Sequence, residues 1–244
     1  MRQLDRNYIF EFAGMPQGGK TSVKETLAHY LKRMEYPVVE FNGGSRYPRL
    51  PIYRMPIGEL NSALAQNIES FVLSITEKQG PDHNIYLLDR GLIDRCIFTK
   101  ALALDKKISQ EQEERLYKSL TSPVLLDKLD GVFIFITSPE TALKREYASK
   151  LVERKNVRFQ GDAMNEHFLH EMRIAADEWY TLLNTQTNSH VKYVERIDTT
   201  PIETDMKKVA EYVFDRISKR FPELGLELID ANSGSHTKMK PHRK

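Results

Sequence analysis

Apolar residues along the chain gather in five short runs, and longer segments with helical spacing lie between them. Such runs predict β-strands. The expected strands are 7–13, 37–42, 84–89, 131–136 and 192–198. The run GVFIFI at 131–136 is apolar throughout, which is typical of a strand that helices cover on both faces.

Between these runs, apolar residues recur at three- and four-residue spacing, as Leu60, Leu64 and Ile68 do, and this predicts amphipathic helices. The expected helices are 20–34, 58–79, 92–104, 109–120, 139–158, 164–184 and 203–221. Strands that alternate with helices predict an α/β fold, a three-layer doubly wound parallel sheet of about five strands.

We expect one domain over residues 1–229, because 244 residues suffice for one large domain and no repeat or linker divides the chain. The 40 % of hydrophobic residues can fill a sizeable core. The basic tail 230–244 lacks apolar anchors, so we expect it to be disordered.

Charge and cysteine content exclude several classes of protein. The net charge of only +2 argues against a broad nucleic-acid-binding surface. The single cysteine, Cys96, excludes an internal disulfide framework and fits a reducing compartment, and its apolar neighbours favour a buried structural role. No apolar stretch is long enough to span a membrane, and the N-terminus lacks the hydrophobic region of a signal peptide. We therefore expect a cytoplasmic protein.

Residues 14–21 read GMPQGGKT and match the phosphate-binding pattern G-x-x-x-x-G-K-[ST] between an expected strand and an expected helix. The glycines let backbone N–H groups surround phosphate oxygens, Lys20 can reach the terminal phosphates, and the Thr21 hydroxyl can bind Mg2+. A Gly-rich turn would explain the glycines but not the Lys-Thr pair. The expected cofactor-binding residues here are Gly14, Gln17, Gly18, Gly19, Lys20, Thr21 and Ser22.

Ligands on such sheets bind at the carboxyl ends of the strands. Glu40 lies near the end of the second expected strand, where it could accept a proton or hold magnesium through water, although a solvated acid fits equally. Asp89 ends the third strand and is the natural second magnesium group. Arg90, which follows it, can bind phosphate in bidentate fashion, and the alternative for the two is a local ion pair.

Asp94 and Arg95 follow one helical turn later, where they could reach the substrate, or where Asp94 could complement the charge of the helix start. The segment 143–158 is rich in Lys and Arg, which indicates either a solvated helix face or a mobile lid that neutralises the transferred phosphoryl group. Arg145 is the best single candidate in that segment.

The loop 43–56 is rich in Gly, Pro and Arg. Arg46 there could bind an anionic acceptor, and Tyr47 could stack on a base. Gln66, in the helix that follows, could bind a base edge, and the alternative is an exposed helical glutamine.

Taken in order, these segments resemble the thymidylate kinases and deoxynucleoside kinases, two families that share one P-loop fold. The resemblance covers about residues 7–218. It rests on the phosphate loop and on LAHYLKRMEYPVVEF, LLDRGLIDRCIFTKAL, GVFIFITSPETALKRE and IDTTPIETDMKKVAEYV.

The resemblance implies a catalytic base at Glu40, magnesium support at Asp89, and a lid arginine at Arg145. It further implies that Arg90 contacts the reacting end of the substrate, that Asp94 and Arg95 form a substrate-binding pair, and that Thr199 lies near adenine. By the same analogy, a homodimer would form through the helices 58–79 and 92–104.

Three departures from the families stand out. Gly91 occupies the place of a serine in deoxynucleoside kinases, and the Glu-Pro dipeptide after the second strand is Glu40-Phe41. The lid arginines expected after Arg145 fall on Ser149 and Leu151, so Lys150, Arg154 or Arg158 would have to replace them within a lid near 144–162.

The sequence therefore predicts a P-loop kinase that transfers the γ-phosphoryl group of ATP, with Mg2+, to a nucleoside monophosphate. The arginines of the loop 43–56 favour a monophosphate, whereas Glu40 as a base would suit a deoxynucleoside. A regulatory P-loop nucleotide binder without a small acceptor, or a kinase for a non-nucleotide hydroxyl, also fits the pattern.

Overall fold

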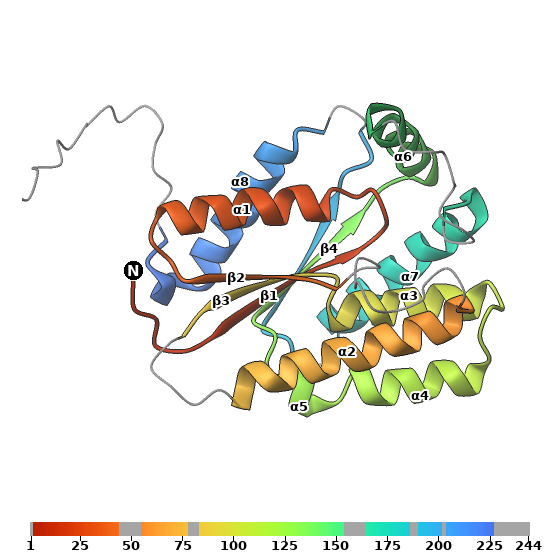
Figure 1. Ribbon diagram of the computed structural model, residues 1–244, viewed down its shortest axis with the longest axis horizontal. Helices are drawn as coiled ribbons and strands as arrows, with labels where there is room; N and C mark the ends of the chain where they lie inside the picture. Colours follow the sequence, from red (N-terminus) through yellow and green to blue (C-terminus); the bar gives the residue numbers. More distant parts are fainter. Residues whose placement is uncertain are drawn as a thin grey trace, which may run out of the picture.

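The computed structural model describes residues 2–43, 55–77, 83–153, 164–185, 190–201 and 204–226. Five parallel strands form one sheet in the order β2-β3-β1-β4-β5. The strands are β1 (Tyr8–Gly14), β2 (Val38–Asn42), β3 (Ile85–Asp89), β4 (Gly131–Ile136) and β5 (Tyr193–Asp198). Helices cover both faces, so the expected three-layer α/β fold is confirmed (Figure 1).

The seven expected helices are present, with ends that differ by a few residues. The helices are α1 (Lys20–Arg33), α2 (Ile57–Glu77), α3 (Leu92–Leu104), α4 (Gln110–Leu120), α5 (Pro123–Leu126), α6 (Pro139–Glu153), α7 (Glu166–Thr185), α8 (Met206–Arg220) and the 3-10 helix η2 (Pro222–Leu224). The sequence did not predict α5, because four residues are too few to show a helical period. Within the described ranges, no helix is long and apolar enough to cross a membrane.

Side chains of the central strand β1 alternate between two cores. Phe10 and Phe12 pack in the core that α1 and α8 cover, whereas Ile9 and Ala13 pack in the core formed with α2, α3 and α7. The two sets of helices lie on opposite sides of the sheet in Figure 1. Tertiary burial of this kind, rather than propensity, supplies most of the stability of the helices.

The strand register brings the chemically interesting residues to one edge. Asp89 at the end of β3 lies opposite Phe12 of β1 and Asn42 of β2, and Gly14 lies opposite Phe135 of β4. The chain leaves β1 first toward β3 and β2 and later toward β4 and β5, so β1 marks the point at which the strand order reverses. Ligands of open parallel sheets bind at such a point.

Candidate nucleotide site

The phosphate-binding loop lies between β1 and α1, and its geometry requires glycine at two positions. Gly14 has a φ angle of +107°, and a Cβ atom there would lie 2.2 Å from the carbonyl oxygen of Phe135. Gly19 has a φ angle of +90°, and its Cβ atom would lie 2.2 Å from Sδ of Met206, the first residue of α8. The positive φ angles disfavour a side chain at both positions, and at Gly14 the backbone of Phe135 also leaves no room for one.

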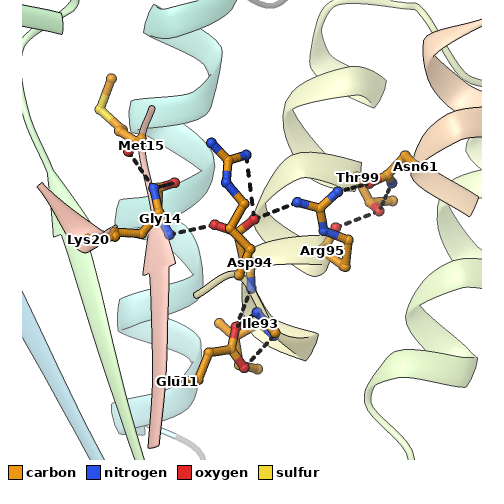
Figure 2. A network of polar contacts seen from close by, with 11 residues as sticks. Glu11, Gly14, Met15, Lys20, Asn61, Ile93, Asp94, Arg95 and Thr99 are labelled. Atoms are coloured by element: carbon orange, nitrogen blue, oxygen red, sulfur yellow. Dashed lines mark hydrogen bonds and ion pairs between the residues drawn. The ribbon is translucent and has the colours of Figure 1, made fainter. Parts of the chain in front are cut away.

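Lys20 is buried and folds back onto the loop. Its Nζ atom donates hydrogen bonds to the carbonyl oxygens of Gly14 at 2.8 Å and of Met15 at 2.6 Å (Figure 2). Burial, with the nearby positive charge of Arg90, lowers the pKa of Lys20 to about 8. A phosphate in the loop would offer this ammonium group an anionic partner in place of two neutral carbonyls.

Thr21 and Asp89 lie together as the sequence predicted. The Thr21 hydroxyl donates to Oδ2 of Asp89 at 2.5 Å, while the other oxygen, Oδ1, is buried and has no hydrogen-bond partner among the described residues. A buried carboxylate oxygen without a partner is costly, and Mg2+ prefers oxygen ligands. In the described parts of the chain, no three His, Cys, Asp or Glu side chains cluster to hold a metal, so phosphate oxygens and water would complete the shell around this pair. The residues present thus fit a magnesium–nucleotide complex.

Arg90 holds a strained backbone conformation directly after β3. Its φ angle is +69°, and its N–H group donates to the carbonyl oxygen of Phe12 at 3.1 Å. A non-glycine residue in this region stores about 1 kcal/mol or more and is often found at functional sites. The Arg90 side chain keeps 28 % of its surface exposed, so a ligand can reach it.

The sequence suggested that Asp94 and Arg95 could reach the substrate. Both side chains are instead buried and form hydrogen bonds inside the protein. Asp94 accepts the N–H group of Gly14 at 3.0 Å and Nη2 of Arg95 at 2.7 Å (Figure 2). Burial alone would raise the pKa of Asp94, but the nearby cations, Arg90 first, hold it below its usual value. Arg95 also donates to Oδ1 of Asn61. A direct contact with substrate would require both side chains to leave these partners.

Glu40 is the third of the five residues of β2 rather than a strand-end residue. Its carboxylate pairs with Nζ of Lys32 at 2.7 Å and of Lys24 at 3.3 Å, both on α1. Burial opposes ionisation, but the hydrogen bonds from the two lysines prevail and lower the pKa of Glu40. The strand ends instead at Asn42, whose Oδ1 atom accepts a hydrogen bond from Lys24 at 2.6 Å.

Arg145 on α6 joins the phosphate loop to the loop after β5. Its guanidinium donates to the carbonyl oxygens of Gln17 at 3.1 Å, Thr199 at 2.8 Å and Pro201 at 2.9 Å. The Thr199 hydroxyl lies 3.1 Å from the carbonyl oxygen of Gly18. The sequence predicted that Arg145 and Thr199 serve the nucleotide site, and the structure brings both to the phosphate loop.

Two buried acids near this loop belong to no motif that the sequence shows. Glu146 on α6 accepts a hydrogen bond from Nε2 of Gln17 at 2.5 Å. Glu11, in the middle of β1, accepts N–H groups at the start of α3 (Figure 2). The signal for Glu11 was an acid in an otherwise apolar strand, at a position whose alternation places it in the core with Ile9 and Ala13.

The remaining candidates lie elsewhere or outside the described residues. Arg46 and Tyr47 fall outside them, as does the lid segment beyond residue 153. Gln66 on α2 and Ser22 in the first turn of α1 are exposed. Cys96 is free and buried, as expected, and burial raises the pKa of its thiol well above the usual value.

Solved structures show what this arrangement is similar to. Deoxyadenosine kinase from M. mycoides with dCMP and dCDP bound shares 14 % identity at a TM-score of 0.61, over 86 % of this chain and 99 % of that chain. The same enzyme with dATP gives 16 % identity and a TM-score of 0.58, over the same shares of the two chains. Thymidylate kinase from Candida albicans shares 14 % identity at a TM-score of 0.62, over 92 % of this chain and 96 % of that chain.

Sequence comparison adds nothing to this likeness. No family model matches the sequence, and no curated protein matches it. The fold predicted from the resemblance is confirmed: the chain has the fold of the P-loop nucleoside and nucleotide kinases.

Proposed function

We propose that the protein is an ATP-dependent phosphotransferase that moves the γ-phosphoryl group of Mg-ATP to a nucleoside monophosphate. The observation that best supports this function is the group formed by Lys20, Thr21 and Asp89. A buried ammonium, a hydroxyl and a carboxylate with one unpaired oxygen meet beside a glycine loop at the reversal point of the sheet. The fold of the structural neighbours supports the same function.

Each residue has a distinct role in this proposal. Backbone N–H groups of the loop 14–21 and Lys20 hold the donor phosphates, and Thr21 and Asp89 hold Mg2+. When bound, Mg2+ neutralises the charge that develops on the phosphate oxygens. Arg90, exposed and next to Asp89, binds the acceptor.

Arg145 and Thr199 shape the donor side of the site. Their contacts to the carbonyl oxygens of Gln17 and Gly18 keep the loop after β5 against the phosphate loop. An adenine ring would lie beside this junction.

The setting of Glu40 supports a monophosphate acceptor over a nucleoside. A hydroxyl nucleophile needs a base, whereas the phosphate oxygen of a monophosphate is already ionised at neutral pH. Glu40 has a lowered pKa and two lysine partners, which make it a poor base. The arginine-rich loop 43–56 would supply the cations that a monophosphate requires.

A turnover screen tests this function. ADP production from Mg-ATP is measured with each common nucleoside and nucleoside monophosphate, and Lys20→Ala serves as the blank. Strong stimulation by a monophosphate is the expected result. Stimulation by nucleosides alone would favour the deoxynucleoside kinase alternative, and ATP binding without any stimulation would favour a regulatory nucleotide binder.

Lys20→Ala should abolish nearly all turnover while the protein stays folded, because the ammonium group has no substitute in the loop. Lys219→Ala is the matched control, since Lys219 lies on the surface, where it pairs with Asp215 on α8. Thermal unfolding checks the fold of both variants. Wild-type turnover in Lys20→Ala would contradict the site assignment.

A further inference from the structure

The start of α3 is capped by a side chain from another element. Gly91 is the N-cap residue and has no side chain to offer, although the first N–H groups of a helix need acceptors. Glu11 of β1 supplies them: Oε1 accepts the N–H groups of Gly91 at 3.1 Å and Asp94 at 2.7 Å, and Oε2 accepts that of Ile93 at 3.1 Å (Figure 2). One carboxylate thus satisfies three backbone donors.

Burial of the Glu11 carboxyl group at this position costs free energy. Glu11 has no exposed surface, and no cationic side chain of the described residues donates a hydrogen bond to it. Burial accordingly raises the pKa of Glu11 to about 7. An apolar residue would suit the core between Ile9 and Ala13 at lower cost, so a role beyond packing is indicated.

The absence of a side chain at Gly91 leaves room for the Glu11 carboxylate. Its φ angle is −102°, so the backbone does not require glycine there. A Cβ atom at this position would lie 2.5 Å from Oε2 of Glu11 and 2.6 Å from its Cδ atom. Gly91 therefore leaves the space that the carboxylate of Glu11 occupies.

The same short segment carries the groups that serve the phosphate loop. Asp94, whose N–H group Glu11 holds, accepts the N–H group of Gly14 through its side chain. Arg90 precedes Gly91, and its N–H group is held by the carbonyl oxygen of Phe12, the neighbour of Glu11 in β1. The positions of Arg90 and Asp94 thus depend on Phe12 and Glu11, two adjacent residues of β1.

We propose that Glu11 is a positioning residue, which fixes residues 90–94 relative to β1 and so aligns Arg90 with the phosphate loop. The proposal deepens the proposed function, and only its kinetic test rests on that function. Glu11 acts through the backbone of α3 and touches no substrate.

Hydrogen exchange tests the positioning without any substrate. Glu11→Gln keeps the shape but removes the charge, and Asp130→Asn is the matched control. Asp130 is a buried carboxylate that accepts the N–H group of Ile9, in the same strand as Glu11, and pairs with Arg6 and Lys192. At pH 8, where Glu11 is mainly ionised, we expect exchange in residues 90–95 to become about tenfold faster in Glu11→Gln, because charge-assisted hydrogen bonds are lost, and to stay unchanged in Asp130→Asn. Unchanged exchange in Glu11→Gln would overturn the proposal.

Kinetics with Mg-ATP and dTMP separate positioning from mere stability. In Glu11→Gln, kcat/KM for dTMP should fall about tenfold, since Arg90 is displaced. Lower thermal stability with unchanged kinetic constants would mean a structural role only and would overturn the proposal. If dTMP and the other monophosphates fail to stimulate the wild type, the proposed function fails, and the exchange experiment still decides the role of Glu11.

Gly91→Ala tests the same contact with Glu11 in place, so the proposal stays falsifiable if Glu11→Gln does not fold, and a double-mutant cycle isolates the contact. Gly91→Ala should lower the unfolding midpoint strongly in the wild type, because the new methyl group meets the Glu11 carboxylate. In a Glu11→Ala background, Gly91→Ala should have little effect. An equal effect of Gly91→Ala in both backgrounds would show that the two positions are not matched.

Discussion

At the scale of single residues, Asp89 combines a burial cost with a binding role. Its Oδ1 atom lacks a partner while Oδ2 accepts the Thr21 hydroxyl. We expect Asp89→Asn to lower turnover about 100-fold, because the ligand charge is lost. Stability should stay the same or rise by about 1 kcal/mol, because a neutral amide is less costly to bury.

Turnover across a magnesium titration and urea unfolding measure the two effects of Asp89→Asn. Asp127→Asn, at an exposed acid that pairs with His190, is the control. A variant that loses stability by several kcal/mol and keeps its magnesium dependence would show that Asp89 is only structural.

The titration of Glu11 should make stability depend on pH. Its folded pKa of about 7 exceeds the usual value of 4.5, so the folded state binds more protons than the unfolded state between these values. Its contribution to stability is therefore greatest below pH 4.5 and is lost as the pH rises through 7, by roughly 3 kcal/mol in total. Asp94, Arg95 and Cys96 share its surroundings and do not reverse this sign.

Urea unfolding of the wild type and Glu11→Gln at pH 5 and pH 8 measures this dependence. The difference in unfolding free energy between the two proteins should change with pH in the stated direction. A constant difference would show that Glu11 does not titrate in this range.

The sequence predicted the roles of residues in local motifs better than those of residues whose partners are distant in sequence. Lys20 and Thr21 belong to a motif whose spacing fixes its geometry, and Asp89 follows from the end of an apolar strand. Glu40 was expected near the end of its strand, and its pairing with Lys24 and Lys32 could not be predicted because both lysines lie on another element, α1. The burial of Asp94 could not be read from its neighbours either, since its partner Gly14 is distant in sequence.

At the scale of elements, α6 links the phosphate loop to the loop after β5 through Arg145. Arg145→Ala would leave three carbonyl oxygens without this donor, so we expect KM for ATP to rise about tenfold. Lys144→Ala removes an adjacent cation that pairs with Glu140 on the surface, and it should have no effect. Steady-state kinetics with varied ATP compare the two, and equal KM values would refute the link.

The strands could be predicted from the sequence because buried parallel strands are continuously apolar, as β4 is. The spatial order of the strands was not predictable in detail, since β2, the second strand in the chain, lies at an edge beyond β3. Long-range packing decides that order. The short helix α5 could not be predicted from the sequence, because only tertiary contacts stabilise a helix of four residues.

At the scale of the whole molecule, the site draws on distant parts of the chain, so only the folded protein should bind Mg-ATP. Saturation to about 100 times Kd would stabilise the fold by about 2.7 kcal/mol. We expect the unfolding midpoint to rise by roughly 5–10 °C, and not to rise in Lys20→Ala. Calorimetry with and without Mg-ATP measures the shift, and an equal shift in both proteins would place the nucleotide elsewhere.

The contact between Gly19 and Met206 has a consequence for the growing polypeptide. The loop leaves the ribosome well before Met206 and the apolar face of α8 that covers α1, because about 185 residues separate them in the sequence. A nascent chain that ends before α8 would carry the complete phosphate-binding motif without the side chain that packs against it. Nucleotide affinity should therefore be acquired only after α8 has left the ribosome, in one step with the docking of this helix.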